Sequence, residues 1–574
     1  MILFQRHVLG RNLKHFASNG KLKYNVINIT RYQTTKKIEE TKTTIPMAEN
    51  TDLFQTERIK RDILPSARIL PMIVDEKDAT VMPFDEVPGP KALKYAAACR
   101  YYLSELGTQL IAGALTLSLN IGSYFNKGNH NYYKFSSLFD EYGPVVRFVN
   151  PVGTDIVLLN HPAHIQKVFS LEGEYPIRST LESLQKFRTE RRSHSYSGIY
   201  NDQSQEWSRR KSDLQLPSEA VLVKQARGIS EVVHRFTNKL YTIRNYQDEV
   251  PNDLYEEIRK WAFDTMGLIM FSKNFSMLDT EVISSQCDVS WMYHSLVHAT
   301  DAILKCEGGL HLWKLFGTPA WYNLVKHCDN LDSLIGKFVL ETEQNILQEV
   351  YDSESSSLAG SILLADKNLN TGDVATILMD MMLIGVNTVA SSMSFLLFYL
   401  AKHQRVQKIL YNEIKNSVHD GVDTTIRELK NKTPYLQACI KETLRLKPPI
   451  PIITRILPKN IILDHYNIPR GTMIIMATQN TSTKETYFDD ASKFYPERWL
   501  QTEALEHQFA CIPFGFGVRK CLGQNMAEAM LSLLTIKILQ KYKLEYHYGD
   551  VSATRDFITR PKRPLKIRFI DRIQ

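Results

Sequence analysis

Residues 514–523 read Phe514-Gly515-Phe516-Gly517-Val518-Arg519-Lys520-Cys521-Leu522-Gly523. The segment combines glycines, an arginine and a lone cysteine in the spacing Phe-x-x-Gly-x-Arg-x-Cys-x-Gly. Glycines permit unusual backbone torsions and close approach, and the apolar stretch 522–539 predicts a helix whose N-terminal end favours an anion. The segment therefore predicts that Cys521 is a thiolate ligand of a haem iron, with Arg519 able to pair with a haem propionate.

Two other interpretations of Cys521 have to be weighed. A lone cysteine is most often an inert thiol in the core. A zinc site could use His507, Cys511 and Cys521, but this spacing matches no familiar zinc motif and provides no fourth ligand. The glycines and the arginine around Cys521 favour the haem interpretation.

The positive charge of the chain is concentrated at its N-terminal end. The sequence has 574 residues and a formal net charge of +8. Residues 1–38 hold eight Lys or Arg and no Asp or Glu, which leaves 62 bases and 62 acids in the remainder. A basic, acid-free leader without a continuous apolar core predicts a mitochondrial transit peptide, with a disordered basic tail as the alternative. The neutral remainder gives no indication of a nucleic-acid partner.

The cysteines and the apolar stretches indicate the type of cellular compartment and the possible membrane contacts. Seven cysteines without framework spacing favour a reducing compartment, so we expect no disulfide. Two uncharged stretches, 106–125 and 381–401, are long enough to cross a bilayer. The second contains Asn387 and several serines within a longer helical pattern, so we expect a buried helix. The first belongs to an apolar insert at 92–127, for which we expect a surface-associated helical hairpin.

The rest of the pattern is mostly helical. We interpret 39–87 as a linker and 88–574 as one domain that begins at a Pro-Gly-Pro turn. Helical periodicity dominates from 180 to 446 and includes a helix that Asp373 is placed to cap and that runs to about His403. Short strands are predicted at 145–149, 155–159, 455–457, 461–463 and 473–476. The sequence therefore predicts a mostly α fold with a small β subdomain.

The segment around Cys521 resembles the haem-binding loop of the cytochrome P450 superfamily, and further marks of that family follow in order over 88–574. The resemblance implies the cytochrome P450 fold and haem b (iron protoporphyrin IX) as the cofactor. It implies Cys521 as the metal ligand and these cofactor-binding residues: Phe514, Gly515, Arg519, Trp207, Lys211 and Arg455. Lys211 stands where the family more commonly has an arginine.

Two further segments are similar to structural marks of the family. Glu442-Thr443-Leu444-Arg445 resembles its Glu-x-x-Arg helix, in which the two charged residues lie on one face. Arg498, in a Pro-Glu-Arg segment, would by that resemblance complete a buried triad with Glu442 and Arg445. A half-satisfied buried charge is costly, so we expect Arg498→Ala to lose haem or aggregate.

The segment Gly385-Val386-Asn387-Thr388 is similar to the step of the family that activates dioxygen. There a threonine and a preceding acid assist oxygen activation and proton delivery, which implies Gly385, Asn387 and Thr388 as catalytic residues. Asn387 departs from the pattern, because an amide cannot relay a proton by ionising. On this interpretation Asn387→Asp would raise the coupling of electrons to product. The alternative is that Gly385 serves helix packing and Thr388 bonds to a carbonyl one turn earlier.

Electron supply and membrane contact are also implied by the resemblance. Lys441 and Lys520 would form a basic dock for an acidic, adrenodoxin-like ferredoxin, although Gln437 replaces a second family base. An aromatic group in the expected substrate-access region favours shallow insertion into a bilayer surface, with burial in the core as the alternative. Its members are Trp313, Phe316, Trp321 and Tyr322.

The segments 174–178, 198–202 and 565–569 resemble the animal mitochondrial clan, which includes sterol hydroxylases and insect ecdysteroid hydroxylases. The resemblance implies a haem-thiolate monooxygenase, peripheral on the matrix side of the inner mitochondrial membrane. It would insert one atom of O2 into a lipophilic steroid or ecdysteroid, with electrons from NADPH through ferredoxin reductase and ferredoxin. The alternatives are a mitochondrial enzyme that oxidises foreign compounds, a reductase-independent haem-thiolate isomerase or dehydratase, and a non-catalytic haem sensor.

Overall fold

The computed structural model describes the chain from residue 81 onward, with gaps. The described residues are 81–91, 94, 135–149, 155–192, 197–203, 205, 207, 208, 210, 211, 221–251, 253–279, 287–307, 311–348, 357–365, 369–418, 426–501, 508–554 and 558–572. They belong to one compact unit that spans Ala79–Gln574. The expected transit peptide at 1–38, most of the linker at 39–87 and nearly all of the insert at 92–127 lie outside the described residues.

Helices make up most of the described unit, which confirms the predicted mostly α fold. The α-helices are α4 (Phe135–Tyr142), α5 (Pro162–Ser170), α6 (Glu182–Lys186), α8 (Ala226–Ile243), α9 (Leu254–Phe271), α10 (Asp288–Glu307), α11 (Pro319–Leu347), α12 (Leu358–Ala365), α13 (Thr371–Lys402), α14 (Gln404–Ser417), α15 (Ile426–Lys432), α16 (Pro434–Leu446), α17 (Thr478–Ser482) and α18 (Gln524–Lys541). Short 3-10 helices are η1 (Phe84–Glu86), η4 (Leu312–Lys314), η6 (Pro496–Trp499) and η7 (Gln508–Ala510), and η3 (Phe187–Arg191) is a π-helix.

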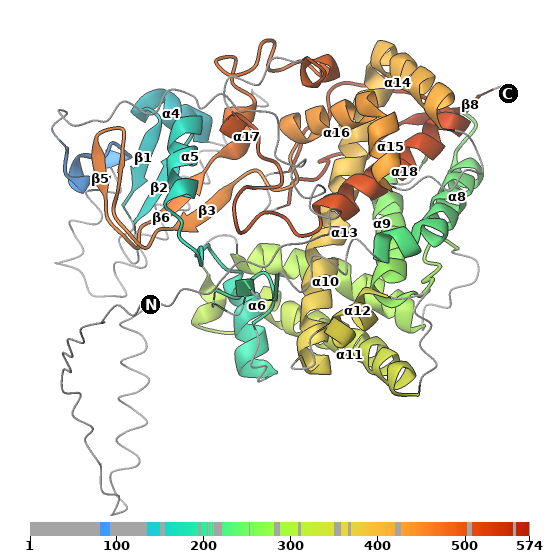
Figure 1. Cartoon of the computed structure of the whole chain (residues 1–574), viewed down its shortest axis with the longest axis horizontal. Coiled ribbons are helices and arrows are strands. Elements are labelled where there is room, and N and C mark those ends of the chain that lie inside the picture. The colour runs from blue at the N-terminus through green and yellow to red at the C-terminus, as the bar shows by residue number, and fades with distance from the viewer. Residues whose placement is uncertain are drawn as a thin grey trace, which may run out of the picture. The chain divides into compact units, whose positions relative to one another are not determined.

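Most of the strands, β1 to β6, form a small subdomain beside the helices, whereas the pair β7-β8 packs in the helical part (Figure 1). The largest sheet has the order β1-β2-β6-β3, and the remaining strands form the pairs β4-β5 and β7-β8. Their bounds are β1 (Val145–Phe148), β2 (Ile156–Leu159), β3 (Ile453–Ile456), β4 (Ile461–Leu463), β5 (Tyr466–Ile468), β6 (Met473–Met476), β7 (Tyr542–Glu545) and β8 (Arg568–Asp571). β4 and β6 have the predicted bounds. β3 begins two residues before the prediction because it pairs antiparallel with the whole of β6, from Ile453 opposite Met476 to Ile456 opposite Met473.

The contacts of the β subdomain begin before the expected domain boundary at Pro88. Met82 forms a parallel bridge to Tyr466. Arg147 of β1 binds Asp85 at 2.8 Å and stacks over the ring of Phe84. Part of the segment assigned to the linker is therefore packed on the sheet.

The described residues contain two large apolar cores, and the segment around Cys521 lies between them. The helical core includes most of α9, α13 and α18. The β core is formed by the sheet and α5, and Phe509 and Ile512 belong to it. Phe514, Val518 and Leu522 pack against the helical core instead. Because the chain crosses from one core to the other within a few residues, the loop is fixed from both sides.

α13 is the long central helix, and the structure corrects its predicted cap. The side chain of Asn370 accepts a hydrogen bond from the backbone N–H of Asp373, so Asn370 is the N-cap and Asp373 lies in the first turn. Among the described residues, α13 is the helix long and apolar enough to cross a membrane, and 78% of its most apolar window is buried inside the protein. The prediction of a buried helix at 381–401 is confirmed.

Candidate haem site

The loop before Cys521 has the geometry that its glycines predict at two positions. Gly515 and Gly517 have φ angles of +72° and +71°, in the region that favours glycine. A Cβ on Gly517 would also lie 2.3 Å from a carboxylate oxygen of Glu172. Gly523 differs from the expectation, because it has a φ of −89° and open space around it. The loop turns back on itself, since the Cys521 N–H donates to the Phe514 carbonyl at 2.9 Å.

Cys521 lies just before a helix, and this helix begins two residues later than the predicted start at Leu522. α18 begins at Gln524 with Gly523 as its N-cap, so Cys521 is outside the helix but close to its positive end. Its side chain is exposed to solvent on one side, and the protein atoms around it still desolvate the thiol. Burial raises the pKa of the Cys521 thiol, and the Gly523 N–H, Arg178 and Lys520 oppose that rise. A bound metal cation deprotonates a coordinating thiol outright.

Buried arginines gather beside this loop. Arg519 donates from Nε to the Pro176 carbonyl at 2.7 Å and from Nη2 to the Asp202 carbonyl at 2.9 Å. Its Nη1 atom is buried and has no hydrogen-bond partner among the described residues. The pKa of Arg519 falls to about 9, because burial and the neighbouring Arg178 and Arg455 disfavour another positive charge more than Asp202 and Glu172 favour it.

The charges of this cluster do not balance within the described residues. Its buried or half-buried cations are Arg178, Lys211, Arg455 and Arg519, and its acids are Glu172 and Asp202; the exposed Lys520 lies beside them and is not counted. Four cations against two carboxylates leave two positive charges. The Nε atom of Arg178 is also buried without a hydrogen-bond partner among the described residues. The two carboxylates of haem propionates fit this surplus in charge and in hydrogen-bonding capacity.

We define the Arg519 cluster as these four cations and two acids. The sequence did not indicate the roles of Arg178 and Glu172. Arg455 of β3 donates from Nε to Glu172 at 2.5 Å, and both side chains are buried. Arg178 donates to the Tyr200 carbonyl at 2.9 Å. Arg178 lies in a segment that we used only as a mark of the mitochondrial clan, and its nearness to Arg519 depends on tertiary structure.

Trp207 and Lys211 lie at the same site, with contacts that differ from the expectation. The indole N–H of Trp207 donates to the Ile199 carbonyl at 2.8 Å, so it is already used. The ring of Trp207 instead forms a floor under the guanidinium of Arg519, 3.8 Å from its centroid. Lys211 donates to the Val518 carbonyl, and burial lowers the pKa of its ammonium. Trp207 therefore positions a cation here rather than offering a donor of its own.

Glu442, Arg445 and Arg498 are brought together as the sequence suggested. Arg445 donates to both carboxylate oxygens of Glu442 at 2.8 Å, and the Nε atom of Arg498 donates to the same group at 3.1 Å. Two donors outside the expected triad also bind Glu442: the Trp499 indole at 2.9 Å and the Tyr495 N–H at 3.0 Å. We define the Glu442 cluster as these five residues.

The three residues expected to act in oxygen activation, Gly385, Asn387 and Thr388, lie on α13. The Thr388 hydroxyl donates to the Gly385 carbonyl at 3.2 Å, and a Cβ on Gly385 would lie 2.9 Å from the end of Met266 of α9. These contacts are those of the packing alternative. Asn387 is buried and donates to Thr300 of α10. Its amide thus joins two helices, a contact that the sequence did not indicate.

A small cavity of about 20 Å³ is lined in part by Thr300 and Leu383, the two residues to which the Asn387 amide donates. Its lining comes from α6, α10 and α13, with Ile558 from the C-terminal region, and it is almost entirely apolar. Asp380 is the charged residue in that lining, and it binds Arg188 at 2.7 Å with both side chains about 1% exposed. Pockets that enclose drug-sized ligands have volumes of about 300–1,000 Å³, so a steroid-sized molecule requires these walls to separate.

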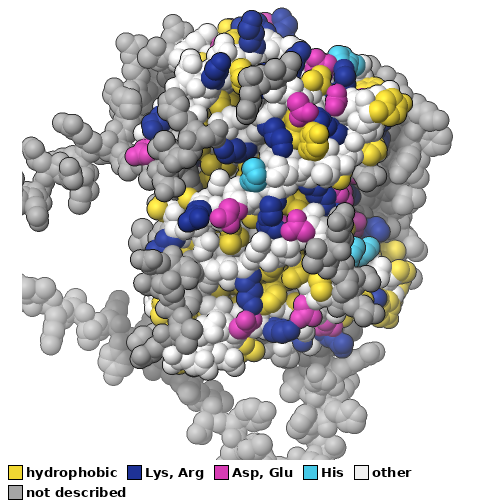
Figure 2. Space-filling view, turned by 90° about the vertical axis from the view of Figure 1, so that its right-hand side faces the viewer, with side chains coloured by type: hydrophobic (Ala, Val, Ile, Leu, Met, Phe, Trp, Pro, Cys, Tyr) yellow, Lys and Arg dark blue, Asp and Glu magenta, His cyan; other side chains and the backbone are white. Residues whose placement is uncertain are grey.

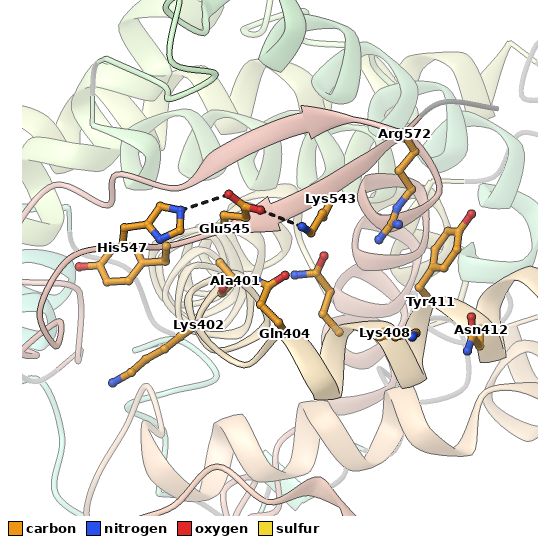
Figure 3. Close-up of a pocket in the computed structure, with 12 residues that line it drawn as sticks. Ala401, Lys402, Gln404, Lys408, Tyr411, Asn412, Lys543, Glu545, His547 and Arg572 are labelled. Atoms are coloured by element: carbon orange, nitrogen blue, oxygen red, sulfur yellow. Dashed lines mark hydrogen bonds and ion pairs between the residues drawn. The ribbon is translucent and has the colours of Figure 1, made fainter.

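A second cavity, of about 630 Å³, is a surface hollow elsewhere (Figure 3). It lies between α14 and β7, and none of the predicted site residues line it. Figure 3 shows Glu545 holding Lys543 and His547 across its upper wall, at 2.8 and 3.1 Å. The size of this hollow therefore does not identify it as the catalytic site.

Most, but not all, of the residues expected to contact a ferredoxin or a membrane are exposed. Lys441 and Lys520 are exposed. The aromatic group divides: Trp313 is buried and stacks on Trp321 at 5.3 Å, whereas Phe316 and Tyr322 are exposed. Leu312 and Leu315 are exposed beside them. On the face drawn in Figure 2, basic and acidic side chains are interspersed.

A zinc site receives no support. Within the part of the chain that the structure describes, no group of three or more His, Cys, Asp or Glu side chains is arranged to hold a metal. Cys511 is half-buried, and desolvation raises the pKa of its thiol to about 12. His507, the third residue of the zinc alternative, lies outside the described residues.

Comparisons with known proteins agree with the geometry. The family model for Cytochrome P450 matches residues 114–569. The mitochondrial 1,25-dihydroxyvitamin D(3) 24-hydroxylase of Rattus norvegicus is 28% identical over 442 residues, which cover 75% of this chain and 82% of that protein. Two proteins of Drosophila melanogaster are similar: probable cytochrome P450 301a1, mitochondrial (24% identical, 85% of this chain and 87% of that protein), and probable cytochrome P450 12a5, mitochondrial (27% identical, 80% and 90%).

Proposed function

The chain belongs to the cytochrome P450 family of haem-thiolate monooxygenases, and from that premise we propose that it inserts one atom of dioxygen into a steroid or ecdysteroid in mitochondria. The cofactor is haem b, and its electrons come from NADPH through ferredoxin reductase and an adrenodoxin-like ferredoxin. Similar proteins named as mitochondrial, one of them a hydroxylase of 1,25-dihydroxyvitamin D(3), support the proposal.

One observation carries the proposal most directly. Cys521 stands beside a partly buried surplus of positive charge, with one partnerless donor on Arg519 and one on Arg178 among the described residues. Such donors are costly unless a ligand satisfies them. A haem would satisfy them, because its two propionates would supply two negative charges and Cys521 would hold its iron.

The roles of the residues follow from their positions. When bound, the haem supplies the redox chemistry that activates dioxygen. Cys521 would hold the iron, while Arg519, Arg178, Arg455 and Lys211 would bind the propionates. The Thr388 hydroxyl, 3.2 Å from the Gly385 carbonyl, would turn from that carbonyl to hold a proton over the site. The apolar lining of the small cavity excludes water and orients a lipophilic substrate.

Exposed bases near the loop support the electron-transfer part of the proposal. Lys520 is exposed next to Cys521 in the chain, and Lys441 is exposed on α16, which contacts α18. Opposite charges across an interface accelerate encounter with an acidic partner. Peripheral contact with the inner mitochondrial membrane is supported by the exposed apolar side chains near α11: Leu312, Leu315, Phe316 and Tyr322.

The test combines spectroscopy with turnover. Purified protein is reduced under carbon monoxide and should give the spectrum characteristic of thiolate ligation. It is then incubated with NADPH, ferredoxin reductase, ferredoxin and a panel of sterols and ecdysteroids under ¹⁸O₂. We expect one labelled oxygen atom in a defined product. A thiolate spectrum with labelled product only from foreign compounds would reject the steroid assignment, and the absence of label in any product would reject oxygen insertion.

A reductase-independent isomerase or dehydratase is the second candidate. Both N–H donors of Asn387 are engaged within the protein, at 3.2 and 2.9 Å, and an amide cannot deliver a proton by ionising. Product formation without NADPH and ferredoxin would favour this candidate. Strict dependence on both would exclude it.

A further inference from the structure

The side chain of Asn387 forms a hydrogen-bonded link between α13 and α10. Its Nδ2 atom donates to Thr300 Oγ1 at 3.2 Å and to the Leu383 carbonyl at 2.9 Å. The Thr300 hydroxyl donates to the Leu296 carbonyl at 2.8 Å. While the Thr300 proton is held by the Leu296 carbonyl, Thr300 can only accept from residue 387. In this arrangement the link requires a donor at position 387.

The link lies at the edge of the small cavity described above. Thr300, Ile303 and Leu304 of α10 line one wall, and Leu383 and Ile384 of α13 line the wall that faces it. Asn387 and Thr300 are only 3% and 8% exposed, so solvent cannot replace their hydrogen bond readily. Asn387 therefore joins the two helices whose side chains form these walls.

We propose that Asn387 is a positioning residue that holds α10 against α13 and so sets the width of the small cavity between these two helices. Its consequence for turnover rests on the proposed function, whereas the link between the helices does not. The proposal gives a physical reason for an amide where the family has an acid. An ionised carboxylate has no donor for Thr300 and would face the Leu383 carbonyl, another acceptor. These contacts favour the opposite outcome to the sequence-based expectation for Asn387→Asp.

Hydrogen exchange on the holoenzyme, without substrate, tests the link directly. Thr300→Val keeps the shape of the side chain but removes the acceptor. A buried hydrogen bond contributes about 1 kcal/mol, so exchange of the α10 amides should rise about fivefold. Asn387→Asp should have the same effect. Thr300→Ser restores the hydroxyl and should return exchange to the unmodified level.

The double variant shows whether the two residues act through each other. If they share one bond, Thr300→Val combined with Asn387→Asp should be no worse than either alone. Thr342→Val on α11 is the matched control. Its hydroxyl is also buried and bonds only within its own helix, to Phe338 at 2.8 Å, so α10 exchange should not change.

Ligand affinity gives a second measurement that does not depend on turnover. 4-Phenylimidazole binds haem iron from the substrate side, and its affinity can be read from the absorption spectrum. Thr300→Val and Asn387→Asp should each change this affinity in the same direction and by about fivefold. Thr300→Ser should leave it unchanged.

The proposal is overturned if Thr300→Val leaves α10 exchange unchanged, if the effects of the two variants add, or if Asn387→Asp improves coupling without loosening α10. Failure of the ¹⁸O₂ experiment with the exchange pattern intact would reject the proposed function and leave the link standing.

Discussion

The Glu442 cluster and the Arg519 cluster are both built from buried or half-buried charges, but they differ in whether protein groups alone satisfy these charges. Glu442 receives donors from Arg445, Arg498, Tyr495 and Trp499, and the remaining arginine nitrogens bind carbonyl oxygens such as those of Ser482 and Asp489. The Arg519 cluster keeps two excess positive charges and buried donors without partners among the described residues. A structural charge cluster satisfies itself, whereas a cofactor site is completed by the cofactor.

The largest effect is expected at the sulfur that the Arg519 cluster flanks. Cys521→Ala should abolish the thiolate spectrum under carbon monoxide and reduce turnover to background, because no other side chain at this position supplies the anionic ligand. Cys287→Ala is the control, since Cys287 lies at the start of α10 and accepts only a backbone N–H, from Ser290 at 3.3 Å. Retained spectrum and turnover in Cys521→Ala would contradict the site altogether.

Removing an arginine from the Glu442 cluster should destabilise the fold itself. Arg445→Ala leaves the fully buried Glu442 without its bidentate partner and should cost about 3–5 kcal/mol in urea unfolding. Arg498→Ala should cost less, about 1–3 kcal/mol, because Glu442 keeps its other donors. The control is the exposed Arg405, which pairs with the half-buried Glu497; Arg405→Ala should cost less than about 1 kcal/mol, because Glu497 keeps the hydrogen bond from the Tyr435 hydroxyl. Normal haem content and stability in Arg445→Ala would show that this cluster does not support the fold.

Asp264 is a third kind of buried charge, held by N–H groups rather than by a cation. Met277 and Leu278 donate to it at 2.9 and 3.1 Å, and burial raises its pKa from 3.8 to about 6, although Arg235 opposes the rise and Asp279 adds to it. The folded state therefore holds a proton that the unfolded state has lost. Stability should fall by about 2–3 kcal/mol as pH rises from 4 to 6.

Asp264→Asn should remove this part of the pH dependence while leaving the rest of the profile in place. The measurement is the free energy of unfolding in urea at pH 4, 5, 6 and 7. An unchanged slope in the variant would show that Asp264 ionises normally.

Removing a cation from the Arg519 cluster should weaken haem retention more than it lowers stability, which is the opposite of the expectation for the Glu442 cluster. Arg519→Gln removes a propionate partner and should weaken haem retention about tenfold, measured by haem transfer to an acceptor apoprotein. The stability of the haem-free protein should change by less than about 1 kcal/mol, because relief of repulsion offsets the lost hydrogen bonds. A large loss of apoprotein stability with normal haem retention would show that this cluster is structural.

The smallest effect is expected where charge lies on the surface. Lys441→Glu should raise the apparent KM for ferredoxin about threefold at low salt and less at high salt, because exposed charges steer association and are screened. Lys415→Glu on α14, an equally exposed lysine, should have no effect. Equal effects of the two variants would indicate net charge rather than a dock.

Local sequence determined much of the secondary structure and the Cys521 loop. The alternating and helical patterns specified β4, β6 and the course of α13, because periodicity reports which face is buried. The spacing of Gly515, Gly517 and Cys521 specified the loop, since positive φ angles at two of these positions leave little choice of residue. The glycine at 523 carried no such constraint, and the cap of α13 was placed three residues late.

Tertiary structure decided how distant charges meet. Arg178, Glu172 and Arg519 are more than three hundred residues apart at the extremes and become one cluster only because the β core and the helical core meet at the loop. The bond from Asn387 to Thr300 likewise joins helices 87 residues apart. Sequence patterns report periodicity and local torsion preferences, whereas the pairing of buried polar groups depends on which elements pack side by side.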